Sequence, residues 1–386
     1  MDATPSHSPS TPPSPTPPES SPRPAHRTPP STDPPTTGKA KAMPIKEEDN
    51  ETSILDTLDT GYESDTPLAL QTETQLELES EKERYPGAST WAPDEERLFE
   101  ILFQRAERAI LPGHWEVDFR GIPMLDTVFS MNDDVRPIVY SRSGKDFQGI
   151  LPPPLTNKGT ISPQTSTARL TRLFKKATMA LLRLIDLTSS VRTTVQSGLG
   201  QKAPPLIKKS LDRYLSWAAE DGGYSHLRYV PNIITAELDA SLGESEITSM
   251  MEQRMRALAL LQREFLRVDR DDDFWSVEEL VDRYVGRRGN GDADADDDDE
   301  LVFRRKPPVV YGLFILRSSV FLLTVDSAKG ADAYVSFHVD VHFMDRHQSV
   351  WNALTIAIAV CLARDQLVRR VEDFEESPDV QGSESD

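Results

Sequence analysis

The sequence predicts an α+β protein in which a helix-rich domain surrounds a small, mostly antiparallel sheet near the C-terminus. Residues 309–316 and 320–325 are continuous apolar runs, which are typical of strands buried on both faces. Residues 334–343 alternate between apolar and polar side chains, as a half-buried strand does. Residues 350–367 are apolar on nearly all sides, which predicts a helix packed inside the core.

The first part of the chain has a different composition. Residues 1–88 are rich in Pro, Ser and Thr and then in Glu and Asp, and they carry many of the 30 prolines. Such a segment buries too little apolar surface to offset chain entropy, so we expect a long disordered tail. Repeated Ser-Pro and Thr-Pro pairs make it a candidate for phosphorylation, with a polyproline-like spacer as the alternative. Lys46 lies in the sequence Ile-Lys-Glu-Glu, which resembles the consensus for attachment of small ubiquitin-like modifiers.

One α/β domain is expected over residues 89–372, and folding is expected to begin near Trp91. Pro93 and the three acids after it suit the start of a helix. Apolar residues with helical spacing predict further helices downstream. The remaining expected elements are short strands at 116–120 and 137–140, a proline-rich loop at 151–167, helices at 167–187, 206–220 and 245–268, and a shorter helix from Ser276.

Two acidic segments interrupt or end this domain. The insertion at residues 287–304 contains a run of aspartates, and residues 373–386 form an acidic stretch that we expect to be disordered. The insertion is either a surface for a basic partner or a solvated, flexible loop. Its composition favours the loop.

Bulk properties restrict the location of the protein. The single cysteine, Cys361, cannot form an intramolecular disulfide, so nothing indicates an oxidising compartment. No apolar run near the N-terminus resembles a signal peptide. The longest apolar stretch, residues 353–363, has about half of the roughly 20 residues that a membrane span needs. We therefore expect a soluble intracellular protein with no membrane partner, in the nucleus rather than the cytoplasm.

A basic patch contrasts with the net charge of −20. The net charge disfavours binding of nucleic acid by the whole chain without excluding it at a local surface. The patch could bind an acidic protein, RNA or DNA, or the acidic insertion of the same chain, or it could be an ordinary solvated helix face. Its members are Arg169, Arg172, Lys175, Lys176 and Arg183.

The alternating strand supplies the sharpest candidate site. Period two aims His338, Asp340 and His342 in one direction, which is how imidazoles on a strand can share a metal ion. Asp326 ends the strand before them. The alternative is an ordinary solvent face, because a half-buried strand shows alternating polar residues in any case. We favour this alternative, so our main expectation is that the protein holds no metal or cofactor.

The same residues weakly resemble the core of restriction-endonuclease-like, PD-(D/E)XK, proteins. The resemblance covers residues 277–365 and rests on Asp326 and on Asp340-Val341-His342. It implies two carboxylates that bind Mg²⁺ for phosphodiester hydrolysis. His342 stands where those families have Lys, and Val325 stands where they have Pro. The resemblance therefore implies a metal-dependent nuclease or an inactive relic of one.

Three further runs resemble a family of uncharacterised proteins from filamentous ascomycete fungi. They are residues 91–96, 216–224 and 345–351. This resemblance implies an origin and no activity. Our main expectation is a non-enzymatic interaction or regulatory protein, whose modifiable tail and folded domain serve a protein partner. A nuclease using Asp326, Asp340 and His342 is the alternative.

Overall fold

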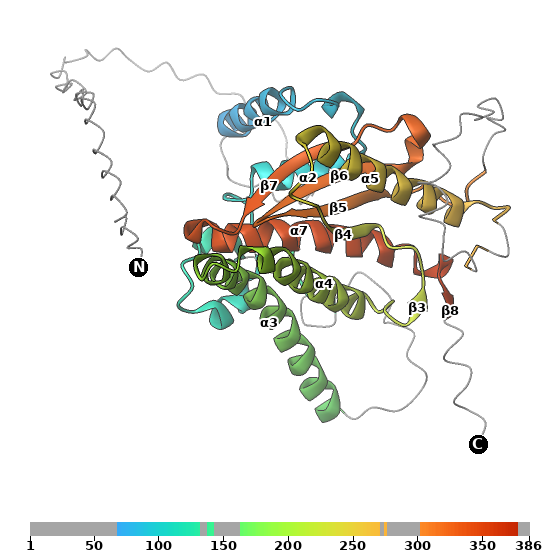
Figure 1. Ribbon diagram of the computed structural model, residues 1–386. Coiled ribbons are helices and arrows are strands. Elements are labelled where there is room, and N and C mark those ends of the chain that lie inside the picture. Colours follow the sequence, from blue (N-terminus) through green and yellow to red (C-terminus); the bar gives the residue numbers. More distant parts are fainter. Residues whose placement is uncertain (1–67, 132–136, 143–162, 271–273, 276–301, 377–386) are drawn as a thin grey trace, which may run out of the picture. The chain divides into compact units, whose positions relative to one another are not determined.

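A four-stranded sheet organises the fold and confirms the predicted α+β class with a mostly antiparallel C-terminal sheet (Figure 1). The strand order is β4-β5-β6-β7, in which β5, β6 and β7 are antiparallel neighbours and β4 is parallel to β5. The strands are β4 (Ile233–Glu237), β5 (Val309–Leu316), β6 (Ser319–Asp326) and β7 (Ser336–His342).

The computed structural model describes residues 68–131, 137–142, 163–270, 274–275 and 302–376. Five expectations lie wholly or mostly outside these residues: the tail up to residue 67 with Lys46, the loop 151–167 up to residue 162, the helix expected from Ser276, all but the last residues of the insertion 287–304, and the tail 373–386 after residue 376. At the end of that insertion, Phe303 forms a β-bridge with Arg267.

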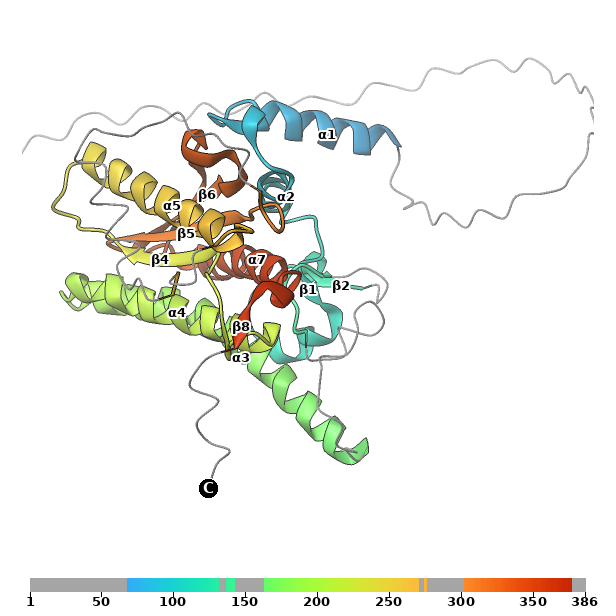
Figure 2. The same ribbon diagram turned by 90° about the vertical axis from the view of Figure 1, so that its right-hand side faces the viewer.

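Helix α7 (Ser349–Val368) lies between the sheet and a pair of helices, α3 (Pro163–Gln196) and α4 (Ala203–Gly222) (Figures 1 and 2). It is buried on all sides because it has neighbours on all sides, which explains its lack of a polar face. The helix is long and apolar enough to cross a membrane, but 89% of that window is buried inside the protein. Alanines at 353, 357, 359 and 363 have no exposed surface and let the neighbours approach closely.

The opposite face of the sheet is covered by α5 (Glu244–Leu266) (Figure 2). Val310, Phe314 and Val325 of the sheet pack against Met255 and other apolar residues of this helix. Gly312 lies on the same face, where an added Cβ would overlap the Phe314 ring and the Met255 sulfur. A glycine at this position therefore sets how closely α5 approaches β5.

The folded region begins earlier than the expected boundary at residue 88. Helix α1 (Leu68–Lys82) precedes that boundary, and α2 (Pro93–Phe103) follows it. Leu78 is only 4% exposed and packs with Trp91 and Phe99. The sequence conceals this helix because its apolar residues are diluted by glutamates and do not form a complete stripe.

Several local expectations were wrong. Residues 113–119 form a 3-10 helix rather than a strand, and no strand forms at 137–140. Helix α3 begins at Pro163, inside the expected loop 151–167, because proline suits the first turn of a helix. The expected tail 373–386 starts with β8 (Glu375–Glu376), which pairs with β3 (Leu227–Arg228). A further short pair joins β1 (Leu111–Pro112) and β2 (Phe129–Ser130).

We expect Gly312→Ala to lower the free energy of unfolding by about 1–3 kcal/mol, because an added methyl overfills a packed interface. Phe314 and Met255 are both fully buried and have little room to move. Urea denaturation measures the change. The matched control is Gly200→Ala, where nothing lies within 4 Å of the added Cβ and a change of about 0.5 kcal/mol or less is expected. Equal effects of the two substitutions would contradict the close approach of α5.

Candidate functional site

A β-bulge in β7 divides the polar residues that the sequence placed on one face. Leu322 pairs with Val339 and Leu323 pairs with Phe337, so His338 is an extra residue opposite the two leucines. An extra residue reverses the side-chain alternation on either side of it. Before the bulge, Ser336 and His338 point toward α2 and are 1% and 4% exposed. The expectation of a single solvent-facing row was wrong for this reason.

After the bulge, Asp340 and His342 point to the opposite face and are exposed. His342 Nε2 lies 2.6 Å from Asp340 Oδ2, and Ser319 Oγ lies 2.8 Å from His342 Nδ1. The order hydroxyl, imidazole, carboxylate occurs in serine hydrolases. These three side chains, however, lie on an open strand surface where water competes for every bond. We therefore assign them to surface hydrogen bonding. The sequence does not single out Ser319, because only the hairpin register places it opposite His342.

Asp326 lies apart from both groups. Its side chain is 5% exposed and accepts a hydrogen bond of 3.1 Å from the Ala328 amide, which starts the 3-10 helix η6 (Ser327–Asp332). Asp340 pairs with Phe321, five residues earlier in β6, so about 17 Å of strand separates the two carboxylates. They also point to opposite faces. Among the described residues, no group of three or more His, Cys, Asp or Glu side chains is arranged to hold a metal ion. The geometry thus lacks the convergence that a shared Mg²⁺ requires.

A buried hydrogen-bonded cluster joins the start of α2 to the sheet, and we call it the Glu95 cluster: Glu95, Thr324, His338, Trp91 and Ser336. Thr324 Oγ1 lies 2.6 Å from Glu95 Oε1 and 2.7 Å from His338 Nε2. The other carboxylate oxygen of Glu95 accepts the amide hydrogen of Ala92 at 2.9 Å. The Trp91 indole donates to Ser336 Oγ at 2.8 Å, and its ring centroid lies 5.2 Å from that of His338.

Burial governs the titration of this cluster. Loss of solvation raises the pKa of Glu95, while hydrogen bonds from Thr324 and the Ala92 amide partly oppose that rise. Loss of solvation lowers the pKa of His338 to about 4. Nδ1 of His338 has no hydrogen-bond partner among the described residues. The carboxyl and the imidazole are therefore both driven toward their neutral forms.

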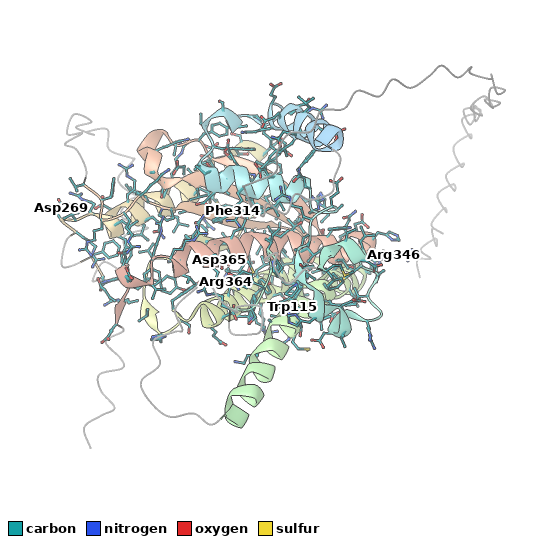
Figure 3. The ribbon with its side chains drawn as sticks, turned by 180° about the vertical axis from the view of Figure 1, so that it is seen from behind. Trp115, Asp269, Phe314, Arg346, Arg364 and Asp365 are labelled. Carbon is teal, nitrogen blue, oxygen red and sulfur yellow. The ribbon has the colours of Figure 1, made fainter. Side chains whose placement is uncertain are left out.

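A second buried cluster surrounds Arg364, near the end of α7 (Figure 3). The guanidinium Nη1 lies 2.8 Å from Asp221 Oδ2 and donates to the Tyr140 carbonyl at 2.8 Å, and Nε donates to Asp365 Oδ1 at 3.0 Å. The Tyr140 ring lies 4.5 Å from the guanidinium carbon. Burial acts to lower the pKa of Arg364, but Cys361 and the two carboxylates act in the opposite direction and the net shift is upward. The buried positive charge of Arg364 is thus compensated by the carboxylates next to it.

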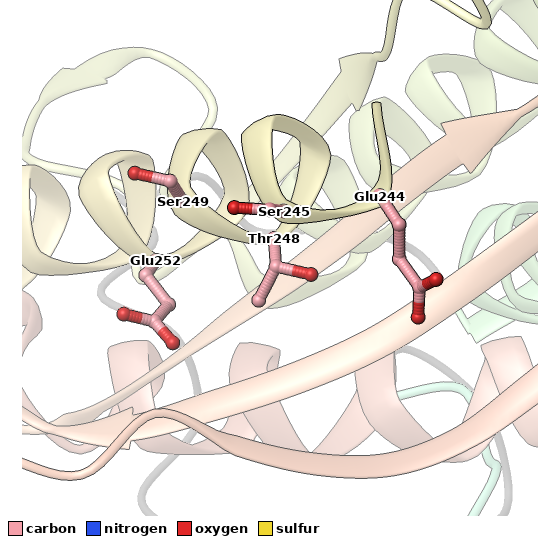
Figure 4. Close-up of a pocket in the computed structure, with 5 residues that line it drawn as sticks. All are labelled: Glu244, Ser245, Thr248, Ser249 and Glu252. Atoms are coloured by element: carbon pink, nitrogen blue, oxygen red, sulfur yellow. The ribbon is translucent and has the colours of Figure 1, made fainter. Parts of the chain in front are cut away.

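Two hollows in the described surface are candidate ligand sites. A cleft of about 390 Å³ lies beside Arg364, between α4, α7 and the segment that leads to β4, and Tyr224 and Tyr229 line it. A shallow hollow of about 530 Å³ runs along the first turns of α5 (Figure 4). Its lining consists of hydroxyl and carboxylate side chains from one open helix face: Glu244, Ser245, Thr248, Ser249 and Glu252. These groups have no apolar wall to enclose a ligand.

The predicted basic patch lies on α3, and the structure extends it onto α4. The side chains of Arg169, Arg172 and Lys175 lie outside the description. Lys176 and Arg183 are exposed on α3, and Lys209 and Arg213 are exposed on α4. We call these four residues the α3–α4 basic face.

Comparison of the chain with protein-family models, curated proteins and solved structures finds no match.

We expect Arg364→Met to lower the free energy of unfolding by about 3–5 kcal/mol, because Asp221 and Asp365 would lose their fully buried cation. Chemical denaturation at neutral pH measures the loss. As a control, Asp340→Asn breaks an exposed pair and is expected to change stability by about 1 kcal/mol or less. A small loss for Arg364→Met would contradict this dependence and would mean that solvent or Arg142 compensates the two carboxylates.

Proposed function

We propose that this chain is a non-enzymatic intracellular interaction or regulatory protein, whose α3–α4 basic face binds an acidic segment of a protein partner. One observation carries the proposal: exposed cations are aligned on one helix pair of a chain whose net charge is −20. The N-terminal tail, with its Ser-Pro and Thr-Pro pairs and Lys46, is the segment we propose to be modified, and we propose the nucleus as the compartment.

The register of the helix pair supports an anion site. Lys176 contacts Glu220 at 3.3 Å, which fixes how α3 lies against α4. Arg183 lies seven residues after Lys176 on α3, and Arg213 lies seven residues before Glu220 on α4, so each is displaced from this ion pair by the same number of residues. Seven residues are about two helical turns, which keeps both side chains on the same outer face. Like charges on one exposed face repel each other, and an anionic ligand between them would relieve that repulsion.

Most of the cations on this face have no ion-pair partner among the described residues. Lys176 has Glu220, but no ion pair with a described residue forms at Arg183, Lys209 or Arg213. Asp186, three residues after Arg183 on α3, is exposed and forms no ion pair with a described residue. The outer position of α3 and α4, on the side of α7 away from the sheet, leaves the face open within the described fold (Figures 1 and 2).

An acidic polypeptide fits this face better than a nucleic acid does. Base stacking needs exposed aromatic rings among the cations. Trp217, on α4, is only 8% exposed, and the exposed apolar residue beside Lys176 and Arg183 is Met179. A long phosphate backbone would also meet the negative charge of the rest of the chain, whereas a short acidic segment would meet less of it.

The use of the buried polar groups supports binding rather than catalysis. Glu95, His338, Asp326 and Arg364 each form bonds inside the fold, where they hold secondary-structure elements together. A binding role requires only the exposed cations, which are separate from these groups.

The test is binding of a fluorescent poly-glutamate peptide by the full chain, followed by anisotropy. We expect Arg183→Glu/Arg213→Glu to weaken binding by about tenfold or more, because two attractions become two repulsions. Affinity should also fall between about 50 and 200 mM salt. The matched control, Arg254→Glu/Arg317→Glu, changes the net charge equally at exposed sites elsewhere and should retain binding within about threefold.

Two outcomes would contradict the proposal. Equal weakening by the two double variants would show attraction to the whole chain rather than to this face. Tighter binding of a duplex RNA of equal charge than of the peptide would assign the face to nucleic acid.

A further inference from the structure

We propose that Glu95, Thr324 and His338 form a buried proton relay, in which protonation of Glu95 obliges His338 to carry its ring hydrogen on Nδ1 instead of Nε2. The relay lies at the junction between the N-terminal helices and the sheet. It is independent of the α3–α4 basic face.

The single hydrogen of the Thr324 hydroxyl links its two neighbours. Thr324 Oγ1 is within hydrogen-bond distance of both Glu95 Oε1 and His338 Nε2. A hydroxyl donates one hydrogen bond, so it can donate to only one of these two neighbours. The other neighbour must donate to the hydroxyl for both short contacts to be hydrogen bonds. The states of the carboxyl and the imidazole are therefore linked.

Two arrangements satisfy both contacts and also give the Thr324 hydroxyl hydrogen an acceptor. A third, in which both neighbours donate to Thr324, would leave that buried hydrogen without a partner and is disfavoured. In the first, Glu95 is ionised, Thr324 donates to it, and His338 donates through Nε2–H. In the second, neutral Glu95 donates to Thr324, Thr324 donates to Nε2, and the hydrogen of His338 is on Nδ1. The second arrangement holds one more proton than the first. That proton enters at Nδ1, the Nε2 hydrogen passes to Thr324, and the Thr324 hydrogen passes to the carboxylate, so every hydrogen is accounted for.

Burial supports this order of events. Glu95 is 2% exposed, and its raised pKa favours uptake of the proton at the carboxyl. The lowered pKa of His338, about 4, keeps the ring neutral while this happens. The other charged groups that act on Glu95 are Asp326 at the end of β6, which favours protonation, and Lys329 of η6, which opposes it. Trp91, whose ring lies against His338, and Ser336, which accepts the hydrogen bond of Trp91, carry no charge.

The relay has a structural output. His338 Nδ1 has no partner among the described residues, and the ring lies against Trp91, whose own hydrogen bond goes to Ser336. A change from a bare lone pair to an N–H group at Nδ1 therefore alters the polarity of the surface on which Trp91 rests. Trp91 and Glu95 connect α1 and α2 to β6 and β7, so the relay couples proton uptake to how firmly the N-terminal helices are held.

The test reads the tautomer of His338 directly, by nitrogen NMR of the full chain labelled at its histidines. The seven histidines are distinguished by comparison with a His338→Gln sample. In the wild type, His338 should change from the Nε2–H to the Nδ1–H form as the pH falls through the raised pKa of Glu95, without forming the imidazolium. A change straight to the imidazolium would overturn the relay.

Glu95→Gln provides the sharpest variant. The Ala92 amide needs an acceptor, so the carbonyl of the introduced glutamine side chain faces it and the amide nitrogen of that side chain faces Thr324. Thr324 must then donate to His338, and we expect the Nδ1–H form at every pH above about 4. Persistence of Nε2–H in this variant would refute the proposal. The near-isosteric substitution keeps the fold testable if more disruptive variants do not fold.

Thr324 supplies the matched pair of controls. Thr324→Ser keeps the hydroxyl and should keep the pH-dependent tautomer change. Thr324→Val removes the hydroxyl at similar volume and should uncouple the tautomer of His338 from the pH. If the Thr324→Val variant shows the same tautomer change as the wild type, the hydroxyl is not the link.

Stability gives an independent readout with a defined sign. Folding raises the pKa of Glu95, so its contribution to stability is present below the unfolded-state pKa and is lost as pH rises through the folded-state pKa. Glu95→Gln removes that loss. The ratio of the wild-type to the variant unfolding constant should therefore grow with pH, by about tenfold for each unit of pKa elevation. A ratio that stays constant from pH 4 to 8 would contradict a raised pKa.

Discussion

Burial of α7 on every side is the constraint on which the other layers depend. Because the helix has no solvent-facing side, the sheet must cover one side and α3 with α4 must cover the other. Small residues along it let three layers come close, so a change of volume would be felt in all of them. The arginine near its end is tolerated because two carboxylates and a backbone carbonyl surround the guanidinium. Core packing and the buried ion pairs are thus parts of one arrangement.

The N-terminal helices depend on a different kind of contact. Apolar packing of Leu78 and Phe99 gives them a small core of their own. Their attachment to the sheet, in contrast, uses hydrogen bonds between Trp91 and Ser336 of β7 and between Glu95 and Thr324 of β6. Hydrogen bonds in a buried site are directional, so they specify one orientation of α2 on the sheet. A titratable carboxyl within that attachment makes the junction sensitive to its own protonation.

Sequence patterns predicted the parts of the fold that repeat along the chain. The buried strands β5 and β6 and helix α7 are continuous apolar segments, and α4 and α5 carry regular apolar stripes. The bounds predicted from the sequence therefore lie within a few residues of the observed ones. The buried polar clusters could not be predicted in this way, because they depend on single residues and tertiary contacts that leave no periodic pattern in the sequence. One extra residue at His338 reverses a face, and Ser319, Thr324 and Arg364 acquire their partners only through tertiary register. Helix α1 was missed because one buried leucine, Leu78, anchors it.

The bulge has a consequence beyond the site, for association between molecules. Strand β7 ends the four-stranded sheet, and a straight edge strand would offer its free amide and carbonyl groups to a strand of another molecule. The extra residue bends this edge and breaks its regular spacing, while Asp340 and His342 place polar side chains along it. Self-association through sheet extension is thereby disfavoured, even though the edge remains uncapped by any strand of the described fold.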